Sequence, residues 1–375
     1  MKTGMSGKNI KTMITPHGTL EAPFFMPDAT RGFVKFTDGE ELKRAGIKAL
    51  VVNTFHLYLQ PGLKIIEKAG GIHEFMNWSG PILSDSGGFQ VFSLIHKNPA
   101  MGKIFDDHVE FKSPLDGSKH ELTPEKAIQI QFSLGVDMMV CLDDCPPNEF
   151  NQEELKKSVN RTIAWAKRCR LEFDKQVKKR KLDDSSRPKI FGVIQGGADL
   201  GLRKYCADEL IKIGFDGYGF GARHVDQEGK FLDKVLEFTA KAIPDEAFKF
   251  GLGIGMPEDI VRAYKMGWDM FDCVIPTREG RHGKLFCWKR MTNDQIPISK
   301  KITGQNFYKA INITNSKFAK DFSPISENSK LEELRGHSKA YLHHLFKLND
   351  PLGARLASLN NLEFYADLME DIKIK

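Results

Sequence analysis

The sequence predicts a (β/α)8 TIM barrel, and two patterns in its 375 residues support this fold class. Eight short apolar runs, rich in Val, Ile, Phe and Met, recur along the first three quarters of the chain and are too short for helices. Segments with helix start and stop signals separate many of them. Continuously apolar strands that alternate with helices are typical of a parallel sheet buried on both faces. A doubly wound sheet is the alternative, but eight strands favour closure into a barrel.

The eight apolar runs are the expected barrel strands, and helix signals lie between them. Thr37 and Glu40 form a capping-box pattern ahead of one helix. Thr123 and Pro124 provide an N-cap and a first-turn proline for another, and Pro257 opens a third. The expected strands are residues 22–26, 49–55, 81–84, 138–142, 190–194, 217–221, 248–254 and 270–275.

Two intervals are too long for a single βα unit, and the pattern changes after the last strand. The interval 91–122 looks like a hairpin inserted on the barrel, and 151–188 contains a long basic helix. We therefore expect a catalytic barrel over residues 1–284 with these two insertions. Residues 285–375 are expected to form an appended α+β subdomain that ends in a helix from about Leu362.

The charge of the chain is modest overall but unevenly distributed. There are 55 Lys and Arg residues against 49 Asp and Glu, a net charge of +6. The segment 156–181 holds eleven basic residues and only two acids, Glu172 and Asp174. Such a segment is either a solvated helix face or a surface for a polyanion such as a nucleic acid.

The cysteines and the lengths of the apolar runs indicate the cellular compartment of the protein. The six cysteines are scattered without a CxxC pair, which favours reduced thiols in a cytoplasmic protein. No run of about 18 apolar residues is present, so we expect no membrane-spanning helix. The polar stretch 1–11 has no apolar core typical of a secretory signal.

Polar side chains follow several expected strands at the ends where barrel enzymes place their chemistry. Asp85 ends the third run, Asp143 the fourth, Gln195 follows the fifth, Gly221 ends the sixth and Asp272 lies in the eighth. A single aspartate at a strand end is usually a turn former or a helix cap. Three carboxylates and an amide at the same end of one barrel would instead form an acidic ligand pocket.

This residue set suits the exchange of a base on a sugar. One carboxylate can attack the anomeric carbon while a second moves the proton. An aspartate beside an amide also matches guanine, because the carboxylate accepts from the ring N–H and the amino group while the amide donates to the carbonyl oxygen.

Four motifs make the chain resemble a known family over almost its whole length. They are SDSGGFQ at 84–90, GVIQGG at 192–197, FDCVIPTREGRHG at 271–283 and AYLHHL at 340–345. With these motifs the chain resembles the tRNA-guanine transglycosylases of bacterial type, which are (β/α)8-barrel pentosyltransferases. The resemblance implies exchange of the wobble guanine of tRNA for a 7-deazaguanine, either queuine or its aminomethyl precursor, by double displacement.

The resemblance also implies residue roles and partners. Asp272 would be the nucleophile that holds the ribose covalently, and Asp85 the general acid/base. The partners would be tRNA, the 7-deazaguanine base and a second copy of the chain in a homodimer. Base-binding residues would be Asp143, Gln195, Phe89, Gly221, Ala222 and Leu252, and RNA-binding residues Thr277, Arg278 and Arg281.

The chain departs from the family at a structural zinc site. The family holds zinc in its C-terminal subdomain through Cys-x-Cys-x-x-Cys and a later His. Those positions are Ser329, Leu331, Leu334 and Asn360 here. Because leucine has no metal-binding atom, we expect neither zinc nor another cofactor, and a hydrophobic contact of Leu331 with Leu334 in its place.

A second departure lies in the pocket, where Gly221 is followed by Ala222–Arg223–His224 instead of small or apolar residues. The identity of the incoming base is therefore open. Two alternatives to the tRNA enzyme remain: the same chemistry on another nucleic acid such as DNA, and a non-catalytic tRNA-binding paralogue. The retained Asp85 and Asp272 argue against the second.

Overall fold

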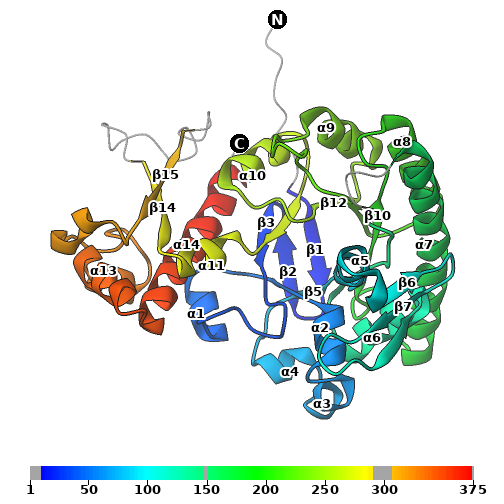
Figure 1. Cartoon of the computed structure of the whole chain (residues 1–375), viewed down its shortest axis with the longest axis horizontal. Helices are drawn as coiled ribbons and strands as arrows, with labels where there is room; N and C mark the ends of the chain where they lie inside the picture. Colours follow the sequence, from blue (N-terminus) through cyan, green and yellow to red (C-terminus); the bar gives the residue numbers. More distant parts are fainter. Residues whose placement is uncertain (1–9, 147–150, 290–305, 374–375) are drawn as a thin grey trace, which may run out of the picture.

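A computed structural model describes residues 10–146, 151–289 and 306–373 of the chain. Most of the polar N-terminal stretch considered above lies outside these ranges. Within them, the barrel and the C-terminal segment lie side by side, and the long helix α14 (Pro351–Lys373) connects them (Figure 1).

The barrel is an eight-stranded parallel sheet, as the sequence predicts. Its hydrogen-bonded order is β3-β13-β12-β11-β10-β9-β5-β4, and a parallel bridge between Asp28 and Val51 joins the two outer strands. The strands are β3 (Phe24–Pro27), β4 (Leu50–Val52), β5 (Ile82–Ser84), β9 (Met138–Val140), β10 (Lys189–Ile194), β11 (Gly217–Phe220), β12 (Phe248–Gly251) and β13 (Met270–Cys273). Each of the eight expected runs therefore overlaps a strand.

An apolar core fills the barrel and is closed at one end by a hairpin. Strands β1 (Thr12–Thr15) and β2 (Gly18–Glu21) pair antiparallel, and Met13 and Leu20 join the interior cluster. The hairpin turn contacts Asp137, which directly precedes β9. The hairpin thus covers the N-terminal end of the barrel, and the opposite end is left for the site.

Helices cover the outside of the barrel. Thr123 caps α6 (Pro124–Leu134) as predicted, and α10 (Pro257–Lys265) begins at Pro257. The capping box of α1 (Gly39–Arg44) is formed by Asp38 and Glu41, one residue later than predicted, because the Asp38 carboxylate reaches the Glu41 N–H. The other helices of the barrel are α2 (Thr54–Leu59), α3 (Leu63–Lys68), α4 (Ile72–Met76), α5 (Gly88–Lys97), α7 (Gln152–Arg180), α8 (Leu200–Ile213), α9 (Asp233–Ala242) and α11 (Ile275–Arg281).

The two intervals that are too long for a single βα unit hold a small sheet and a long helix. After α5 and a short 3-10 helix (Pro99–Met101), the strands β6 (Gly102–Ile104), β7 (Val109–Lys112) and β8 (Lys119–Leu122) form an antiparallel sheet. The predicted hairpin is β7–β8, and β6 adds a third strand to it. The long basic helix is α7, which runs along the outside of the barrel (Figure 1).

The C-terminal segment combines a small sheet with helices. Strands β14 (Lys284–Trp288) and β15 (Tyr308–Asn312) pair antiparallel, and the 3-10 helix Ser316–Lys320, α12 (Glu332–Gly336) and α13 (Lys339–Lys347) follow. The last helix begins at Pro351, eleven residues before the predicted start. Pro351 suits the first turn of a helix, where no partner is needed for its missing N–H.

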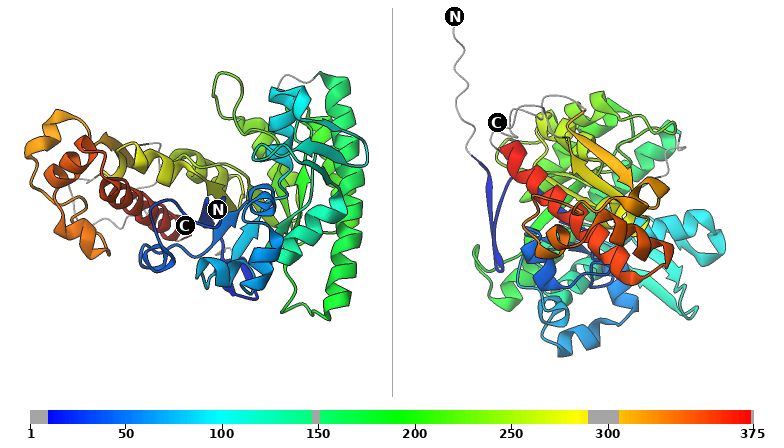
Figure 2. Two further views of the ribbon diagram at one scale, coloured as in Figure 1. Left: turned by 60° about the horizontal axis from the view of Figure 1, so that its bottom comes forward. Right: turned by 90° about the vertical axis from the view of Figure 1, so that its left-hand side faces the viewer.

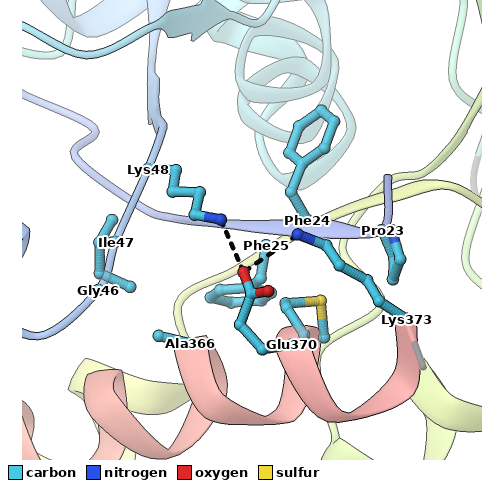
Figure 3. A pocket seen from close by; sticks show the side chains of 10 residues that line it. Pro23, Phe24, Phe25, Gly46, Ile47, Lys48, Ala366, Glu370 and Lys373 are labelled. Carbon is cyan, nitrogen blue, oxygen red and sulfur yellow. Dashed lines mark hydrogen bonds and ion pairs between the residues drawn. The ribbon is translucent and has the colours of Figure 1, made fainter. Parts of the chain in front are cut away.

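Helix α14 belongs to the barrel as much as to the C-terminal segment. The Tyr365 ring lies 4.7 Å from Phe25 of β3, measured between centroids, and both belong to one buried cluster. Near the C-terminal end of α14, Glu370 accepts hydrogen bonds from both Lys48 of the barrel and Lys373 of the helix (Figure 3). Figure 2 shows α14 alongside the barrel wall. Within the described ranges, no helix is both long and apolar enough to cross a membrane.

Candidate active site

The strand register directs the predicted polar residues into one mouth of the barrel. Leu83, Val193 and Met270 are part of the interior core. Since alternate residues of a strand share a face, the side chains two residues further on also point inward. These are Asp85, Gln195 and Asp272, and Asp143 joins them through a hydrogen bond to Gln195.

Asp85 is held by donors from the loop after β4 and from its own loop after β5. Its Oδ1 accepts from the backbone N–H of Thr54 at 3.1 Å and of Gly87 at 3.0 Å, and its Oδ2 accepts from Asn53 Nδ2 at 2.5 Å. Burial raises the pKa of Asp85 to about 7, and the charge of Asp272 adds to the rise against the backbone donors. A carboxyl with this pKa can both donate and accept a proton near neutral pH.

Asp143 and Gln195 form a buried pair. Gln195 Nε2 donates to Asp143 Oδ2 at 2.6 Å, and Gln195 is fully buried. Gln195 Oε1 has no hydrogen-bond partner among the described residues. Burial raises the pKa of Asp143 to about 7. Because an unsatisfied buried amide oxygen is costly, the pair is arranged for a ligand with several hydrogen-bonding groups.

Asp272 is the inward carboxylate at the end of β13. Its Oδ1 accepts from the Gly253 N–H at 2.9 Å. Burial raises the pKa of Asp272 to about 6, with a further contribution from the charge of Asp28. The Gly253 donor fixes one oxygen, and no hydrogen bond from the described residues reaches the other, which leaves it open to an approaching electrophile.

The walls of the pocket are a glycine-rich backbone and two apolar side chains. A Cβ on Gly221 would lie 2.5 Å from Gln195 Cδ, so only glycine fits beside that amide. Ala222 follows with a φ of 77°, a left-handed conformation that disfavours side chains. Leu252 packs against the interior core, and Phe89 at the start of α5 is 59% exposed. An exposed ring at the mouth can stack on a bound base.

The three predicted RNA-binding residues lie on α11, directly after Asp272. Arg278 is exposed and lies 3.5 Å from Glu279, while Arg281 is half-buried. Thr277 is buried, and its hydroxyl donates to the Val274 carbonyl. Arg281 is close enough to Asp28 at the mouth for their charges to interact, whereas Thr277 contributes to the helix itself.

The basic helix α7 is partly neutralised by acids from elsewhere in the fold. Arg161 binds Asp144 and Asp106, and Arg168 binds Glu125. A helix that follows a barrel strand runs back toward the N-terminal ends of the strands, so the exposed Lys178–Lys181 end of α7 lies far from the mouth. The fold thus separates the most basic part of α7 from the pocket.

Sequence reasoning missed two residues at the mouth. Asp28 follows β3, and two residues earlier Met26 pairs with Asp272 and belongs to the interior core, so Asp28 points inward beside the eighth strand. Asn53 follows β4 and donates to Asp85. The criterion that identified Asp85 did not find them, because Pro27 separates Asp28 from the run 22–26 and Asn53 lies inside the run 49–55.

The residues at the family's zinc positions do not fit a metal ion. Ser329 Oγ donates to Glu363 Oε2 at 2.5 Å, and Asn360 Nδ2 donates to the Phe286 carbonyl at 3.0 Å. Leu331 and Leu334 are buried in the same apolar cluster. A zinc site needs several nitrogen, sulfur or oxygen ligands that converge, and here two positions are aliphatic while the other two bond to protein groups.

One other group of metal-ligand type is present in the described residues, at the opposite end of the barrel. It consists of His17, His73 and Asp137. The two imidazole rings stack with centroids 3.5 Å apart and an interplanar angle of 15°. Since imidazole lone pairs lie in the ring plane, stacked rings direct them nearly parallel and not toward one shared ion. Both rings contact Asp137, which also accepts from the Ile82 N–H.

The fold and this mouth define a barrel enzyme with two half-buried carboxylates and a buried carboxylate–amide pair. The chain belongs to the queuine tRNA-ribosyltransferase family, whose model matches residues 6–375, and it is a pentosyltransferase. This agrees with the resemblance noted from the motifs.

Similar proteins span nearly the whole chain, and each is named queuine tRNA-ribosyltransferase. The protein of Thermoanaerobacter pseudethanolicus is 41% identical over 99% of this chain and 91% of its own length. That of Methylacidiphilum infernorum is 40% identical over 99% and 92%, respectively. That of Staphylococcus aureus strain bovine RF122 is 40% identical over 98% and 89%.

Proposed function

We propose that the protein exchanges the wobble guanine of tRNA for a 7-deazaguanine, with Asp272 as nucleophile and Asp85 as general acid/base. The observation that supports this most strongly is the convergence of both carboxylates with the Asp143–Gln195 pair at one end of the barrel. The chemistry of this residue set matches both halves of a base exchange.

The exchange would proceed in two displacements at C1′ of the ribose. Asp272 attacks C1′ as the bond to guanine N9 breaks, and Asp85 supplies the proton that guanine takes up. Asp85 then removes a proton from the incoming base, whose nitrogen attacks C1′ and releases Asp272. The pKa of about 7 for Asp85 and about 6 for Asp272 suits these separate roles near neutral pH.

The base would bind between Phe89 and Leu252 with its edge on the Asp143–Gln195 pair. The backbone amides near Gly221 and Ala222 would complete the recognition of its carbonyl oxygen. A 7-deazaguanine carries the same edge as guanine, so one pocket serves both the leaving and the incoming base. Arg278 and Arg281 would contact the anticodon loop, with the target base turned out of its stack.

A guanine-exchange assay tests this function. Purified protein incubated with radiolabelled guanine should incorporate label into unmodified tRNA that carries the queuosine-type anticodon. The same RNA with adenine at the wobble position is the control and should stay unlabelled. Absence of label in the correct tRNA would refute the function, and label in a matching DNA hairpin alone would favour the DNA alternative.

We also propose that the C-terminal segment is stable without zinc. Burial of Leu331 and Leu334 and the Ser329–Glu363 hydrogen bond replace the cross-links that a metal would provide. Elemental analysis of the purified protein should find much less than one zinc per chain. One zinc per chain that survives dialysis would refute this proposal.

A homodimer through the C-terminal segment is the third proposal. Phe322 is 79% exposed, and the exposed Tyr341 stacks on His337 with ring centroids 4.9 Å apart. Exposed aromatic residues are enriched at protein interfaces. Light scattering should give twice the chain mass for the wild type, and Tyr341→Asp should reduce it to the monomer. A monomeric wild type at micromolar concentration would contradict the proposal.

A further inference from the structure

A buried arginine connects the two backbone segments that line the base pocket. Arg203 of α8 is 1% exposed. Its Nε donates to the Gly197 carbonyl at 2.6 Å, Nη1 to Ile194 at 3.2 Å and Nη2 to Gly221 at 2.9 Å. One planar guanidinium thus holds the ends of both β10 and β11.

The charge of Arg203 is unusual because no carboxylate pairs with it among the described residues. Its Cζ lies 4.0 Å from the centroid of the Phe220 ring, and its hydrogen bonds go to backbone carbonyls. Burial lowers the pKa of Arg203 to about 9, so it stays charged at neutral pH. An arginine buried without a counter-ion is costly, and a hydrophobic residue would fill the space at lower cost.

Two of the three carbonyls belong to residues close to Gln195 in the chain, and the third belongs to Gly221 of the pocket wall. Ile194 and Gly197 flank Gln195, whose backbone N–H lies 3.4 Å from Cys206 Sγ on the same helix α8. Gly196 allows this segment to approach helix α8 closely. Its φ is 136°, and a Cβ there would lie 2.7 Å from the backbone nitrogen of Arg203. Helix α8 therefore fixes the segment from which the Gln195 side chain projects.

The bond to Gly221 also sets the direction of the next N–H. In a trans peptide the carbonyl and the following N–H point in opposite directions. With the Gly221 oxygen held by Arg203, the Ala222 N–H faces away from the guanidinium, and it interacts with the Cys145 thiol beside Asp143. A cationic donor on the carbonyl also polarises the peptide and strengthens its N–H as a donor.

We propose that Arg203 is a positioning residue that aims the Ala222 N–H and the Gln195 amide at the carbonyl oxygen of the bound base. The inference rests on the proposed base exchange, because it assigns a function to the wall of that same pocket. It concerns recognition of the base only, so Arg203 does not act on the ribose or on the phosphates of the RNA.

The test compares guanine with 2-aminopurine, which lacks both the carbonyl oxygen and the proton on N1, in competition with guanine exchange on tRNA. In the wild type, 2-aminopurine should bind at least 100-fold more weakly than guanine. Arg203→Lys should raise the KM for guanine about tenfold or more and leave the KM for tRNA within twofold. It should lower the ratio of guanine affinity to 2-aminopurine affinity by about the same factor as it raises the KM for guanine, and the part of the ratio that Asp143 provides through N1–H should remain. Phe220→Leu, which removes only the ring under the guanidinium, should change the same ratio less.

Leu210→Ala is the matched control, because Leu210 is fully buried on the same helix and faces an apolar cluster. It should lower the Tm without changing the KM for guanine or the ratio of the affinities for guanine and 2-aminopurine. The proposal is overturned if Arg203→Lys and Phe220→Leu behave like this control. Loss of exchange in the wild type itself would instead refute the proposed function.

Discussion

At the scale of single residues, the pocket keeps three carboxyl groups in surroundings that disfavour their charge. Burial is the largest cause of the raised pKa values of Asp85, Asp143 and Asp272. A carboxyl whose pKa is raised by folding binds its proton more tightly in the folded state. Such a carboxyl therefore adds to the free energy of unfolding at low pH, and this stabilisation is lost as the pH rises toward the folded-state pKa.

Asp272→Asn should consequently stabilise the protein at high pH while it abolishes exchange. The variant removes a charge from a half-buried side chain but can still accept from the Gly253 N–H. At pH 8 its Tm should rise by about 2–6 °C, and at pH 4, where Asp272 is mostly protonated in the folded state, it should change little. Calorimetry at the two pH values measures this. A Tm that falls equally at both would contradict the account of Asp272.

Ala222→Gly should stabilise the protein. Ala222 has a φ of 77°, and a left-handed alanine costs about 1 kcal/mol relative to glycine. The Tm should rise by roughly 2–4 °C per kcal/mol. Ala127→Gly, in the regular helix α6, is the control and should lower it by about the same amount. Identical losses in both variants would show that the conformation of Ala222 carries no strain.

At the scale of elements, the C-terminal segment keeps its shape with side chains in place of a metal. Leu334 is fully buried in a cluster with Leu331, Leu342 and Leu345. Leu334→Ala should lower the free energy of unfolding by about 2–5 kcal/mol, whereas Leu348→Ala at a 64% exposed position should change it by under about 0.5 kcal/mol. Denaturant titrations measure both.

The same titrations in a chelator test the role assigned to these leucines. EDTA should leave the unfolding midpoint of the wild type unchanged, because the account assigns no stability to a metal. A midpoint that falls on chelation would mean that a metal, bound through other residues, stabilises the folded chain.

The accuracy of the sequence reading also differs from element to element. Continuous apolar runs locate all eight strands, since strands buried on both faces need apolar side chains throughout. The start of α14 was missed because residues 351–361 lie between the barrel and β14, so their burial pattern is not that of a one-sided helix. Arg203 was missed because its partners are backbone carbonyls, which leave no sequence pattern.

At the scale of the whole molecule, barrel closure brings together carboxylates that are far apart in sequence. Asp272 must be ionised to attack, and Asp85 must be protonated to supply the proton to guanine. With pKa values of about 6 and about 7, kcat/KM for tRNA should rise through about pH 6 and fall above about pH 7. Because the charges of Asp85 and Asp272 interact, the two apparent pKa values of the profile describe the pair of groups together.

Initial rates at saturating base between pH 5 and 9 measure this profile. Asp28→Asn should lower both apparent pKa values of the profile, because it removes a charge that raises the pKa of both Asp85 and Asp272. A rate that increases steadily up to pH 9 would contradict the role of Asp85 as an acid.

The central claim is that Asp272 forms a covalent bond to the ribose of the RNA, and intact-mass spectrometry of the trapped intermediate tests it most directly. Wild-type protein mixed with tRNA and quenched in denaturant should contain a species with the mass of one chain plus the RNA without its wobble guanine. Peptide mapping should place the bond on Asp272, and Asp272→Asn should lack the species. An adduct that persists in Asp272→Asn, or that maps to Asp85, would contradict the account.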